Sequence, residues 1–454
     1  MSDFTGLAIA GRIATPSDPD WDQARAAWNL AADQRPEAVA FAESADDVAK
    51  TVRFAADNDL RVAGQGTGHG AVALGSLEAT ILLKTERMRG IEVDPDAQTA
   101  RVEAGVLVVE LSEAAQAHGM SSMPGSSPDV GVTGYTLGGG LSWLGRRYGF
   151  ACNRVRAIEL VGADGEPRTV DAENEPDLFW ALRGGGGGYA IVTALQLDLV
   201  PISEIYAGAL VFPAELGAEA VRVYRDWAAG VSDDVTSVVR FITPPPLPDV
   251  PEPIRGRPLL TIDGACIGSR ADGEATVAPL RELGETIMDT WGQIPSEGLC
   301  RIHMDPENPV PGMGHHALLR ELPDEAIETF AGVAGSESNT PLLLTELRHL
   351  GGALGRPDEN GGALTHLDAD FALFGVGMLM TPELGEAIDA HLDRVTEAMS
   401  PWAVEGGYFN FAERPSDADA ILSPEVCARL ADVKRRYDPD NRIVANHAVA
   451  IASP

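Results

Sequence analysis

Residues 61–70 read RVAGQGTGHG, with glycine at positions 64, 66, 68 and 70 and a single histidine, His69. Glycine permits positive φ and carries no Cβ, so such a loop lets backbone N–H groups approach an anion closely. The stretch also matches a degenerate dinucleotide fingerprint through Gly66, Gly68 and Ala71, but residues 71–84 offer only one short helical turn where a Rossmann domain needs a long helix. We therefore predict an anion-binding loop after a strand; on this stretch alone, a glycine-rich turn without chemistry is the alternative.

Two further glycine-rich segments follow. Residues 124–143 read PGSSPDVGVTGYTLGGGLSW, and residues 182–193 read LRGGGGGYAIVT. Each segment alone is typical of a turn. Three of them, each beside an apolar strand, indicate one long ligand with a charged middle and a flat ring, held by backbone on several sides. A flavin dinucleotide has that shape.

Length, charge and cysteine content limit the number of domains, the partners and the location that we expect. The chain has 454 residues, more than the roughly 250 to 300 that one core supports, so we expect two domains. Its 34 basic and 68 acidic residues give a net charge of -34, which disfavours nucleic acid and anionic membranes as partners. The beginning of the chain lacks a basic leader and no stretch is apolar enough to span a bilayer, so a cytoplasmic location is expected. The four cysteines form no CxxC pair, and we expect no metal site and no disulfide framework.

Hydrophobic patterns divide the chain into three regions. Residues 29–201 alternate short strands and short helices, with a helix at 44–57 capped by Ser44 and a hairpin at 156–172. Residues 202–405 are expected to form an α+β region, with strands within 237–244, 257–268, 342–350 and 370–380 and a helix at 381–399. Residues 406–411 are expected to be a short strand, followed by a helix within 423–439 and a tail too small to fold alone.

The order of four segments resembles the FAD-linked oxidases of the vanillyl-alcohol oxidase superfamily, and within it the berberine-bridge-enzyme-like group. These segments are NLAADQRPEAVAFAESADDVAKTVRFAADNDLRVAGQGTGHG, PGSSPDVGVTGYTLGGG, VGADGEPRTVDAENEPDLFWALRGGGGGYAIVT, and YFNF with VKRRYDPDNRIVANHAV. The resemblance spans nearly the whole chain. It implies an α+β, two-domain PCMH-type FAD-binding fold: residues 1–203 hold FAD, 204–404 form an antiparallel-sheet substrate domain, and 405–454 return to the FAD-binding domain.

The resemblance also implies how FAD is held. His69 would be joined covalently to the 8α-methyl group of the flavin ring, and the loop around it would bind the pyrophosphate. The full set of expected FAD-binding residues is Gly64, Gln65, Gly66, Thr67, Gly68, His69, Gly70, Gly125, Ser126, Ser127, Val130, Gly131, Gly134, Leu137, Gly140, Ile191, Val192, Tyr408 and Asn410.

The sequence departs from the family at one informative tetrapeptide. Many members carry a second covalent bond from a cysteine in a C-P-T-V-like stretch, whereas this chain has Ser127, Pro128, Asp129 and Val130. We therefore expect one covalent link, and we expect the nearest thiol, Cys152, to be a small buried apolar side chain. Val130 lies where the family has its oxygen gatekeeper, and valine there goes with oxidases; ordinary strand packing is the alternative.

Candidate catalytic residues lie in the second half of the chain. Tyr408 and Asn410 match the family's Y-x-N segment, where the tyrosine often accepts a substrate proton. A tyrosine base needs a lowered pKa or concerted transfer, because the usual value is about 10. Period-two alternation places Glu346 and Arg348 on one face of their strand, and these two residues, His366 and Asp370 are candidates to hold substrate, though each could equally be an ordinary structural residue. His315 and His316 are expected at the surface.

The function predicted on this basis is an FAD-dependent oxidase that takes a hydride from an alcohol, an amine or an activated C–H of a small molecule, such as a sugar or a natural product, and reduces oxygen to hydrogen peroxide. Its partners would be that substrate and oxygen, and the oligomeric state stays open. A flavoprotein that sequesters a natural product without turnover is the alternative. A nicotinamide-dependent dehydrogenase is disfavoured by the missing helix after Ala71.

Overall fold

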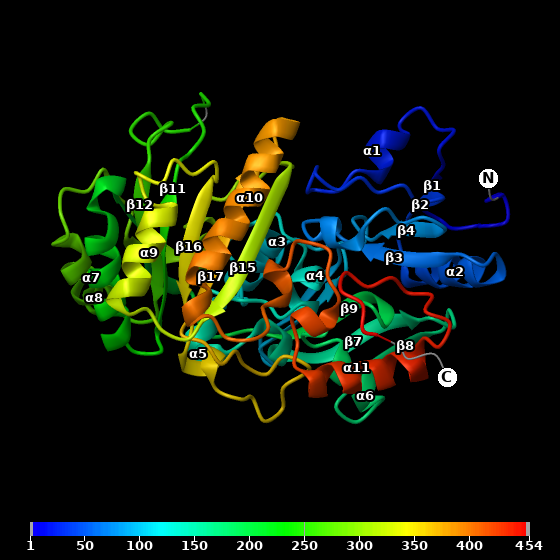
Figure 1. Cartoon of the computed structure of the whole chain (residues 1–454). Coiled ribbons are helices and arrows are strands. Elements are labelled where there is room, and N and C mark those ends of the chain that lie inside the picture. Colours follow the sequence, from blue (N-terminus) through cyan, green and yellow to red (C-terminus); the bar gives the residue numbers. More distant parts are fainter. Residues whose placement is uncertain (1–2, 249, 451–454) are drawn as a thin grey trace.

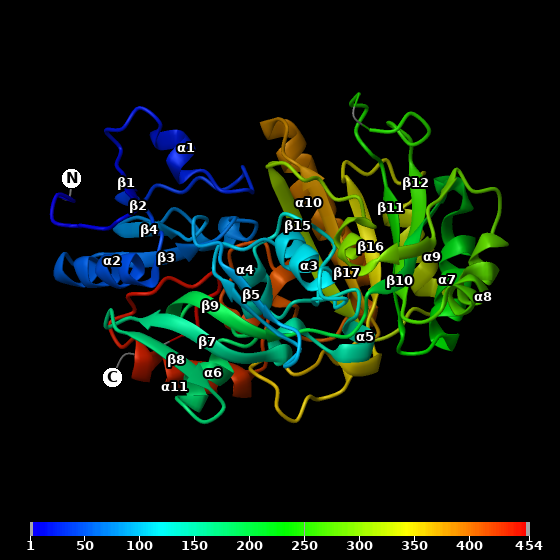
Figure 2. The same cartoon turned by 180° about the vertical axis from the view of Figure 1, so that it is seen from behind.

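The computed structural model describes residues 3–248 and 250–450, which form three β-sheets (Figures 1 and 2). The two smaller sheets lie together in the N-terminal part of the chain. The largest sheet lies beside them and carries its own layer of helices (Figure 1). Among the described residues, no helix has the length and apolar composition needed to cross a bilayer.

The first sheet is formed by strands that come before and after the predicted helix at residues 44–57 in the chain. Its strand order is β1-β2-β4-β3, with β2, β4 and β3 parallel and β1 antiparallel. The strands are β1 (Arg12–Ala14), β2 (Ala38–Phe41), β3 (Arg61–Gln65) and β4 (Thr80–Lys84). Helix α2 (Ala45–Asp57) begins at the predicted cap, since the Ser44 side chain accepts from the Asp47 amide at 3.3 Å. The glycine-rich loop of residues 64–70 starts at the end of β3.

The second sheet is antiparallel, with strand order β5-β6-β9-β7-β8. Its strands are β5 (Ile91–Asp94), β6 (Thr99–Glu103), β7 (Val155–Gly162), β8 (Pro167–Asp171) and β9 (Ala190–Asp198). The helices around it are α3 (Val108–Gln116), α4 (Val132–Leu137), α6 (Pro176–Ala181) and α11 (Pro424–Tyr437). The predicted hairpin at residues 156–172 is confirmed as β7 and β8.

The third sheet is antiparallel, as the resemblance implied, with strand order β13-β10-β12-β11-β16-β17-β15 and β14 paired to β10. Its strands are β10 (Glu204–Pro213), β11 (Val235–Ile242), β12 (Leu259–Cys266), β13 (Met288–Asp289), β14 (Gly292–Pro295), β15 (Gly312–Leu319), β16 (Leu344–His349) and β17 (Phe371–Met378). Its helices are α7 (Gly217–Gly230), α8 (Arg270–Arg281), α9 (Asp324–Ala334) and α10 (Pro382–Met399).

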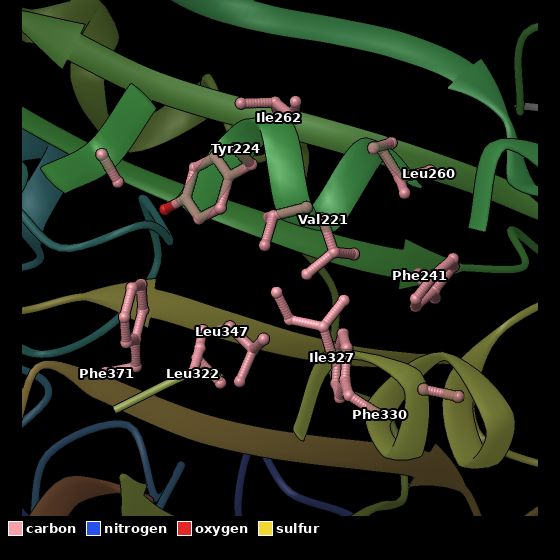
Figure 3. Close-up of a cluster of buried hydrophobic side chains, with 14 of the residues drawn as sticks. Val221, Tyr224, Phe241, Leu260, Ile262, Leu322, Ile327, Phe330, Leu347 and Phe371 are labelled. Carbon is pink, nitrogen blue, oxygen red and sulfur yellow. The ribbon is translucent and has the colours of Figure 1, made fainter. Parts of the chain in front are cut away.

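Alternation along the strands gives this sheet two different faces. One face packs against α7, α9 and α10, and Figure 3 shows Tyr224, Phe330 and Leu347 within this apolar core. The opposite face meets the N-terminal part, where Val238 packs with Trp143. Because side chains alternate along β16, Glu346 and Arg348 lie on the face opposite Leu347 and so face the N-terminal part.

The C-terminal segment returns to the N-terminal part, as Figure 1 shows for α11 beside β7 and β8. The Val62 amide donates to the Arg442 carbonyl at 2.8 Å, and the Val444 amide donates to the Val62 carbonyl at 2.9 Å. The expectation that this tail docks on another part of the chain is thus confirmed. The domain bounds at residues 203 and 404 stay a prediction.

The strand expected at residues 406–411 is wrong. Residues Phe409–Phe411 form a short 3-10 helix, in which the Phe411 amide donates to the Tyr408 carbonyl at 2.9 Å. The side chains of Tyr408 and Asn410 both reach the turn at residues 135–141. The local bond from Phe411 to Tyr408 closes a helical turn, which an extended strand cannot form. The remaining short elements are α1 (Trp21–Arg25), α5 (Gly145–Tyr148), η1 (Ala71–Leu74), η2 (Ala151–Arg154), η3 (Ala214–Leu216), η4 (Ser296–Arg301), η5 (Gly352–Gly355), η6 (Ser400–Trp402) and η8 (Ala418–Ala420).

Candidate functional site

The loop after β3 has the features of an anion site. Gly68 has φ +89°, and a Cβ there would lie 2.8 Å from the Ala27 Cβ, so only glycine fits without a shift. Among the described residues, no protein atom accepts a hydrogen bond from the amides of residues 66–70. The side-chain amide of Gln65 is also buried without a partner in that part of the chain. Five amides and a buried side-chain amide left for a ligand fit a diphosphate, whose oxygens accept hydrogen bonds.

His69 lies in a group of aromatic and acidic side chains. Its Nδ1 is 2.8 Å from the Thr67 Oγ1, its Nε2 is 3.6 Å from an Asp129 carboxylate oxygen, and its ring stacks on Trp28 with 3.9 Å between centroids. The Nε2 atom is buried and has no hydrogen-bond partner among the described residues. A buried ring nitrogen of this kind leaves His69 with bonding capacity that the rest of the chain does not use.

Asp129 was not among the predicted site residues. Burial would raise the pKa of its carboxyl, but His69, Trp28 and Ser127 outweigh that effect, so the pKa is lowered. Trp28 Nε1 donates to one carboxylate oxygen, and Ser127 Oγ donates to the other at 3.1 Å. Asp129 is therefore an ionised group next to His69. The signal in the sequence was the departure from the family's C-P-T-V stretch, where an aspartate replaces the third residue.

The three glycine-rich segments come together, as predicted. A Cβ on Gly131 would lie 3.7 Å from Thr67, which places the second segment against the first. The Leu137 carbonyl accepts from two amides of the third segment, Gly184 and Gly186, both at 3.0 Å. A Cβ on Gly64 would lie 3.2 Å from the Ile191 side chain, which joins the first segment to the third.

The remaining predicted FAD-binding residues occupy several environments. Val192 is buried in the core of the second sheet, and Val130 packs partly against it. A Cβ on Gly125 would lie 3.0 Å from Tyr135, and Gly140 has φ +79° and would bring a Cβ to 2.6 Å from Ala151. Gly134 lies within α4. Close neighbours at these positions leave little room for larger side chains in the glycine-rich segments. Contact of these residues with a flavin stays a prediction.

Tyr408 and Asn410 attach the C-terminal segment to the second glycine-rich segment. The Tyr408 hydroxyl accepts from the Leu141 amide at 2.8 Å and from the Asn410 side-chain amide at 3.2 Å. Asn410 also donates to the Tyr135 carbonyl at 2.9 Å. Burial raises the pKa of Tyr408 well above its usual value, although Leu141 and Asn410 oppose this by donating to its oxygen. Tyr408 is therefore a neutral phenol at physiological pH.

Glu346 and Arg348 form a buried ion pair facing the same region. Arg348 Nε donates to Glu346 at 2.5 Å, and Arg348 Nη2 lies 3.4 Å from the Ser126 hydroxyl. Burial would raise the pKa of Glu346, but Arg348 and His303 outweigh it and lower the pKa to about 2. Glu346 is therefore a carboxylate. Arg348 also lies over the Phe411 ring, 5.3 Å from its centroid, and that ring packs against Tyr408 with 5.0 Å between centroids.

A small cavity lies between the second glycine-rich segment and the third sheet. Its walls include Ser126, Leu141, Trp143, Thr236 and Arg348. The Trp143 indole N–H is buried without an acceptor among the described residues. This cavity is the candidate substrate pocket, since Leu141 and Arg348 join it to Tyr408 and Glu346.

Two predicted candidates do not join this group, and one residue joins it unexpectedly. Within residues 3–248 and 250–450, no hydrogen bond or ion pair links His366 to Tyr408, Glu346 or Arg348; its Nδ1 lies 2.8 Å from Thr365. Asp370 also stays outside the group, and burial with nearby carboxylates raises its pKa. His316 was expected at the surface, but its Nε2 accepts from the Tyr408 amide at 3.0 Å, so that expectation is wrong.

Comparisons with known proteins agree with this arrangement. The family profile of the FAD binding domain matches residues 36–171. The chain is 27% identical to (R)-6-hydroxynicotine oxidase of Paenarthrobacter nicotinovorans over 98% of both proteins. Two solved structures share its fold: glucooligosaccharide oxidase from Acremonium strictum, described with a 6-S-cysteinyl, 8α-N1-histidyl FAD (TM-score 0.83, 20% identity, 98% of both chains), and berberine bridge enzyme from Eschscholzia californica (TM-score 0.82, 19% identity, 98% of this chain and 97% of that one). The chain thus contains an FAD binding domain, is similar over its whole length to an FAD-linked oxidase, and shares the fold of berberine bridge enzyme.

Proposed function

We propose that the protein is a covalent FAD oxidase that oxidises a small molecule at a carbon bearing an amine or a hydroxyl group and produces hydrogen peroxide. The observation that carries this proposal is the placement of Tyr408, whose hydroxyl is held by Leu141 on the wall of the cavity that Arg348 also lines. The full-length similarity to a hydroxynicotine oxidase supports it and favours turnover over sequestration. FAD would supply the acceptor for the hydride and would pass its electrons to oxygen.

The chain's own residues support one attachment through His69. Its buried ring nitrogen without a partner and the five amides of residues 66–70 fit a tethered ring and a diphosphate. Ser127 stands where many relatives have a cysteine, and Cys152 is fully buried with a pKa raised by burial to about 12. A thiol with that pKa is a poor nucleophile at neutral pH, so we propose a single covalent link.

The groups beside the cavity favour an amine as the substrate. An alcohol must give up its O–H proton during oxidation, whereas a neutral amine needs no base. Tyr408 is a phenol with a raised pKa, and Glu346, with a pKa of about 2, is a very weak base. Because the Tyr408 oxygen already accepts two hydrogen bonds, its own O–H hydrogen is left to donate to a substrate atom. In this arrangement Tyr408 orients the substrate.

Acid precipitation tests the covalent link. We expect the wild-type pellet to be yellow and His69→Ala to release its flavin into the supernatant, because no second side chain would hold the ring. His118→Ala is the matched control, since His118 is exposed. A colourless wild-type pellet would show that the link is absent.

A peroxide assay with a panel of secondary amines, alcohols and sugars tests the reaction. We expect peroxide from at least one neutral amine, with bleaching of the flavin under nitrogen and recovery in air. Binding of a panel compound without bleaching would support the sequestration alternative instead.

We also infer a cytoplasmic location. Cys152, Cys266, Cys300 and Cys427 are all free, and three of them are buried. Four unpaired thiols are typical of proteins in a reducing compartment.

A further inference from the structure

A cluster of six charged side chains lies on the face of the third sheet that meets the N-terminal part. Its carboxylates and cations are equal in number, and its members come from β11, β12, β16 and the connection between η4 and β15. The cluster consists of Arg240, Asp263, His303, Asp305, Glu346 and Arg348. Sequence analysis identified only Glu346 and Arg348, the two members on β16.

His303 lies at the centre of this cluster and is 1% exposed. Its Nδ1 is 2.7 Å from an Asp263 carboxylate oxygen, and its Nε2 is 3.1 Å from a Glu346 carboxylate oxygen. A neutral imidazole has one ring nitrogen with a lone pair, and that lone pair would here face a carboxylate. Only the doubly protonated ring gives an N–H to each side. The Nδ1–Asp263 contact is an ion-pair distance without hydrogen-bond geometry, and the Arg348 Nη2 also lies 3.4 Å from the Nε2. The position of the ring between two carboxylates, with the shorter Nε2 contact made to Glu346, favours an imidazolium.

Charges on all sides of the ring agree with this. Burial and the nearby Arg240 both oppose a charged ring, but Asp305, Asp263 and Glu346 outweigh them, and the pKa of His303 is raised. The Trp143 ring, on the cavity wall, packs against the imidazole with 5.7 Å between centroids. Without His303, two buried carboxylates would face each other with less positive charge between them.

A continuous set of contacts leads from His303 to the cavity. On one side, Arg240 pairs with Asp263 at 2.9 Å and donates to the His303 carbonyl at 2.6 Å, which holds this end in place. On the other side, one Glu346 oxygen meets His303 and the other accepts from Arg348. Arg348 then reaches the cavity and the Ser126 hydroxyl. The four groups from Asp263 to Arg348 thus alternate in charge.

We propose that His303 is a positioning residue, a permanent imidazolium that keeps Glu346 charged and thereby holds Arg348 in the cavity wall, where it contacts the substrate. The part of this inference that concerns substrate rests on the proposed oxidase function. The charge state of His303 does not, because it is inferred from the position of its ring between the Asp263 and Glu346 carboxylates. His303 acts through Glu346 and does not itself line the cavity.

The charge state is tested on the wild-type holoprotein by two-dimensional 1H–15N spectroscopy of the histidine side chains at pH 8. The His303 signals are assigned as those missing in His303→Gln, or, should that variant not fold, as those shifted in Glu346→Gln. We expect both ring nitrogens to be protonated at this pH, above the usual histidine pKa of about 6.5. A neutral tautomer would overturn the proposal, whether or not a substrate has been found.

The positioning role is tested with His303→Gln, Glu346→Gln and the double variant, once a substrate is identified. We expect His303→Gln to raise KM by about tenfold or more, with a smaller change in kcat and an unchanged flavin content, because Arg348 loses its fixed orientation. We expect the acidic limb of kcat/KM to move to higher pH, since the pKa of Glu346 rises without its cationic neighbour.

The double variant decides between positioning and general structural support. If His303 acts through Glu346, the double variant is no worse than Glu346→Gln alone; additive losses contradict the proposal. His391→Gln is the matched control, because His391 is a buried histidine on α10 that donates to the Val333 carbonyl, on the helical side of the sheet. It should leave KM and the pH profile unchanged.

Discussion

Single residues around His69 show how neighbours set the chemistry of one side chain. Asp129 is ionised and lies 3.6 Å from the His69 Nε2, while Trp28 both stacks on the ring and donates to the same carboxylate. A carboxylate next to an imidazole orients the ring. His69 is therefore held in place by three different interactions, with Thr67 bonded to its other nitrogen.

Asp129→Asn should lower the fraction of flavin that stays with the acid-precipitated protein. The neutral amide keeps the size of Asp129 but removes the negative charge beside His69, so attachment should become slower and less complete. The measurement is the ratio of bound to total flavin absorbance at a fixed time after adding FAD to protein produced without it. Asp96→Asn, in an exposed turn, is the control. If Asp129→Asn retained as much flavin as the wild type, Asp129 would have no role in the covalent attachment.

The sequence predicted the residues that belong to local motifs and missed those that act across the fold. His69, Tyr408 and Asn410 lie in recognisable segments, and the structure brings each to a plausible partner. His303 meets Glu346 from 43 residues away, through a connection without a motif. His366 has the right residue type but lies in a loop that turns it toward Thr365. Residue type alone cannot predict such contacts, because the path of a connection depends on the packing of the whole domain.

At the scale of elements, strand periodicity was more informative than strand propensity. Alternation in β16 predicted that Glu346 and Arg348 share a face, and Leu347 on the other face packs in the helical core. The segment at residues 406–411 is rich in aromatic residues, which favour strands, and was expected to be a short strand. Its two polar side chains reach the glycine turn, and this tertiary contact outweighs propensity.

The turn at residues 138–140 and Tyr408 fit closely together. Gly139 has φ +126°, and a Cβ there would lie 2.9 Å from a Tyr408 ring carbon and 2.8 Å from Leu364. Gly139→Ala should lower the free energy of unfolding by about 1 to 3 kcal/mol from backbone strain, and should reduce kcat/KM by displacing the tyrosine. Urea unfolding and the peroxide assay measure the two effects.

Gly332→Ala is the control for that substitution. Gly332 lies in α9, and among the described residues no atom outside the adjacent residues and the backbone of the helix is within 4 Å of the added Cβ. Because alanine is the better helix former, this variant should be unchanged or more stable by up to about 1 kcal/mol, with normal activity. Equal behaviour of the two variants would mean that the 138–140 turn does not position Tyr408.

At the scale of the whole molecule, the two ends of the chain form one unit and the middle supplies the facing sheet. The resemblance predicted this arrangement, whereas hydrophobic patterns alone indicated only that the tail must dock somewhere. The docking depends on Val62 in β3, which exchanges hydrogen bonds with the tail, and on helix α11 in the core of the second sheet. Pairings between such distant segments leave no local periodicity to detect.

Lys434 in α11 helps to hold the C-terminal segment against the N-terminal part. Lys434 is 4% exposed, and its ammonium group donates to the Gly188 carbonyl at 2.6 Å, to Asp438 at 2.6 Å and to the Ile443 carbonyl at 2.7 Å. It thus connects the third glycine-rich segment, the end of α11 and the tail that pairs with β3. Burial lowers the pKa of Lys434, although Asp438 opposes this shift.

Lys434→Met should therefore destabilise the protein and loosen the FAD-binding part specifically. It leaves the Asp438 carboxylate buried without its cation, which costs about 3 to 5 kcal/mol in the free energy of unfolding, measured by urea titration. Lys50→Met, which removes the exposed pair between Lys50 and Asp46, should cost less than about 1 kcal/mol. In protein carrying His69→Ala, where no covalent bond retains the cofactor, Lys434→Met should also weaken FAD binding, and Lys50→Met should not. If both lysine variants weakened FAD binding equally, the hypothesis that the C-terminal segment closes the cofactor site would be wrong.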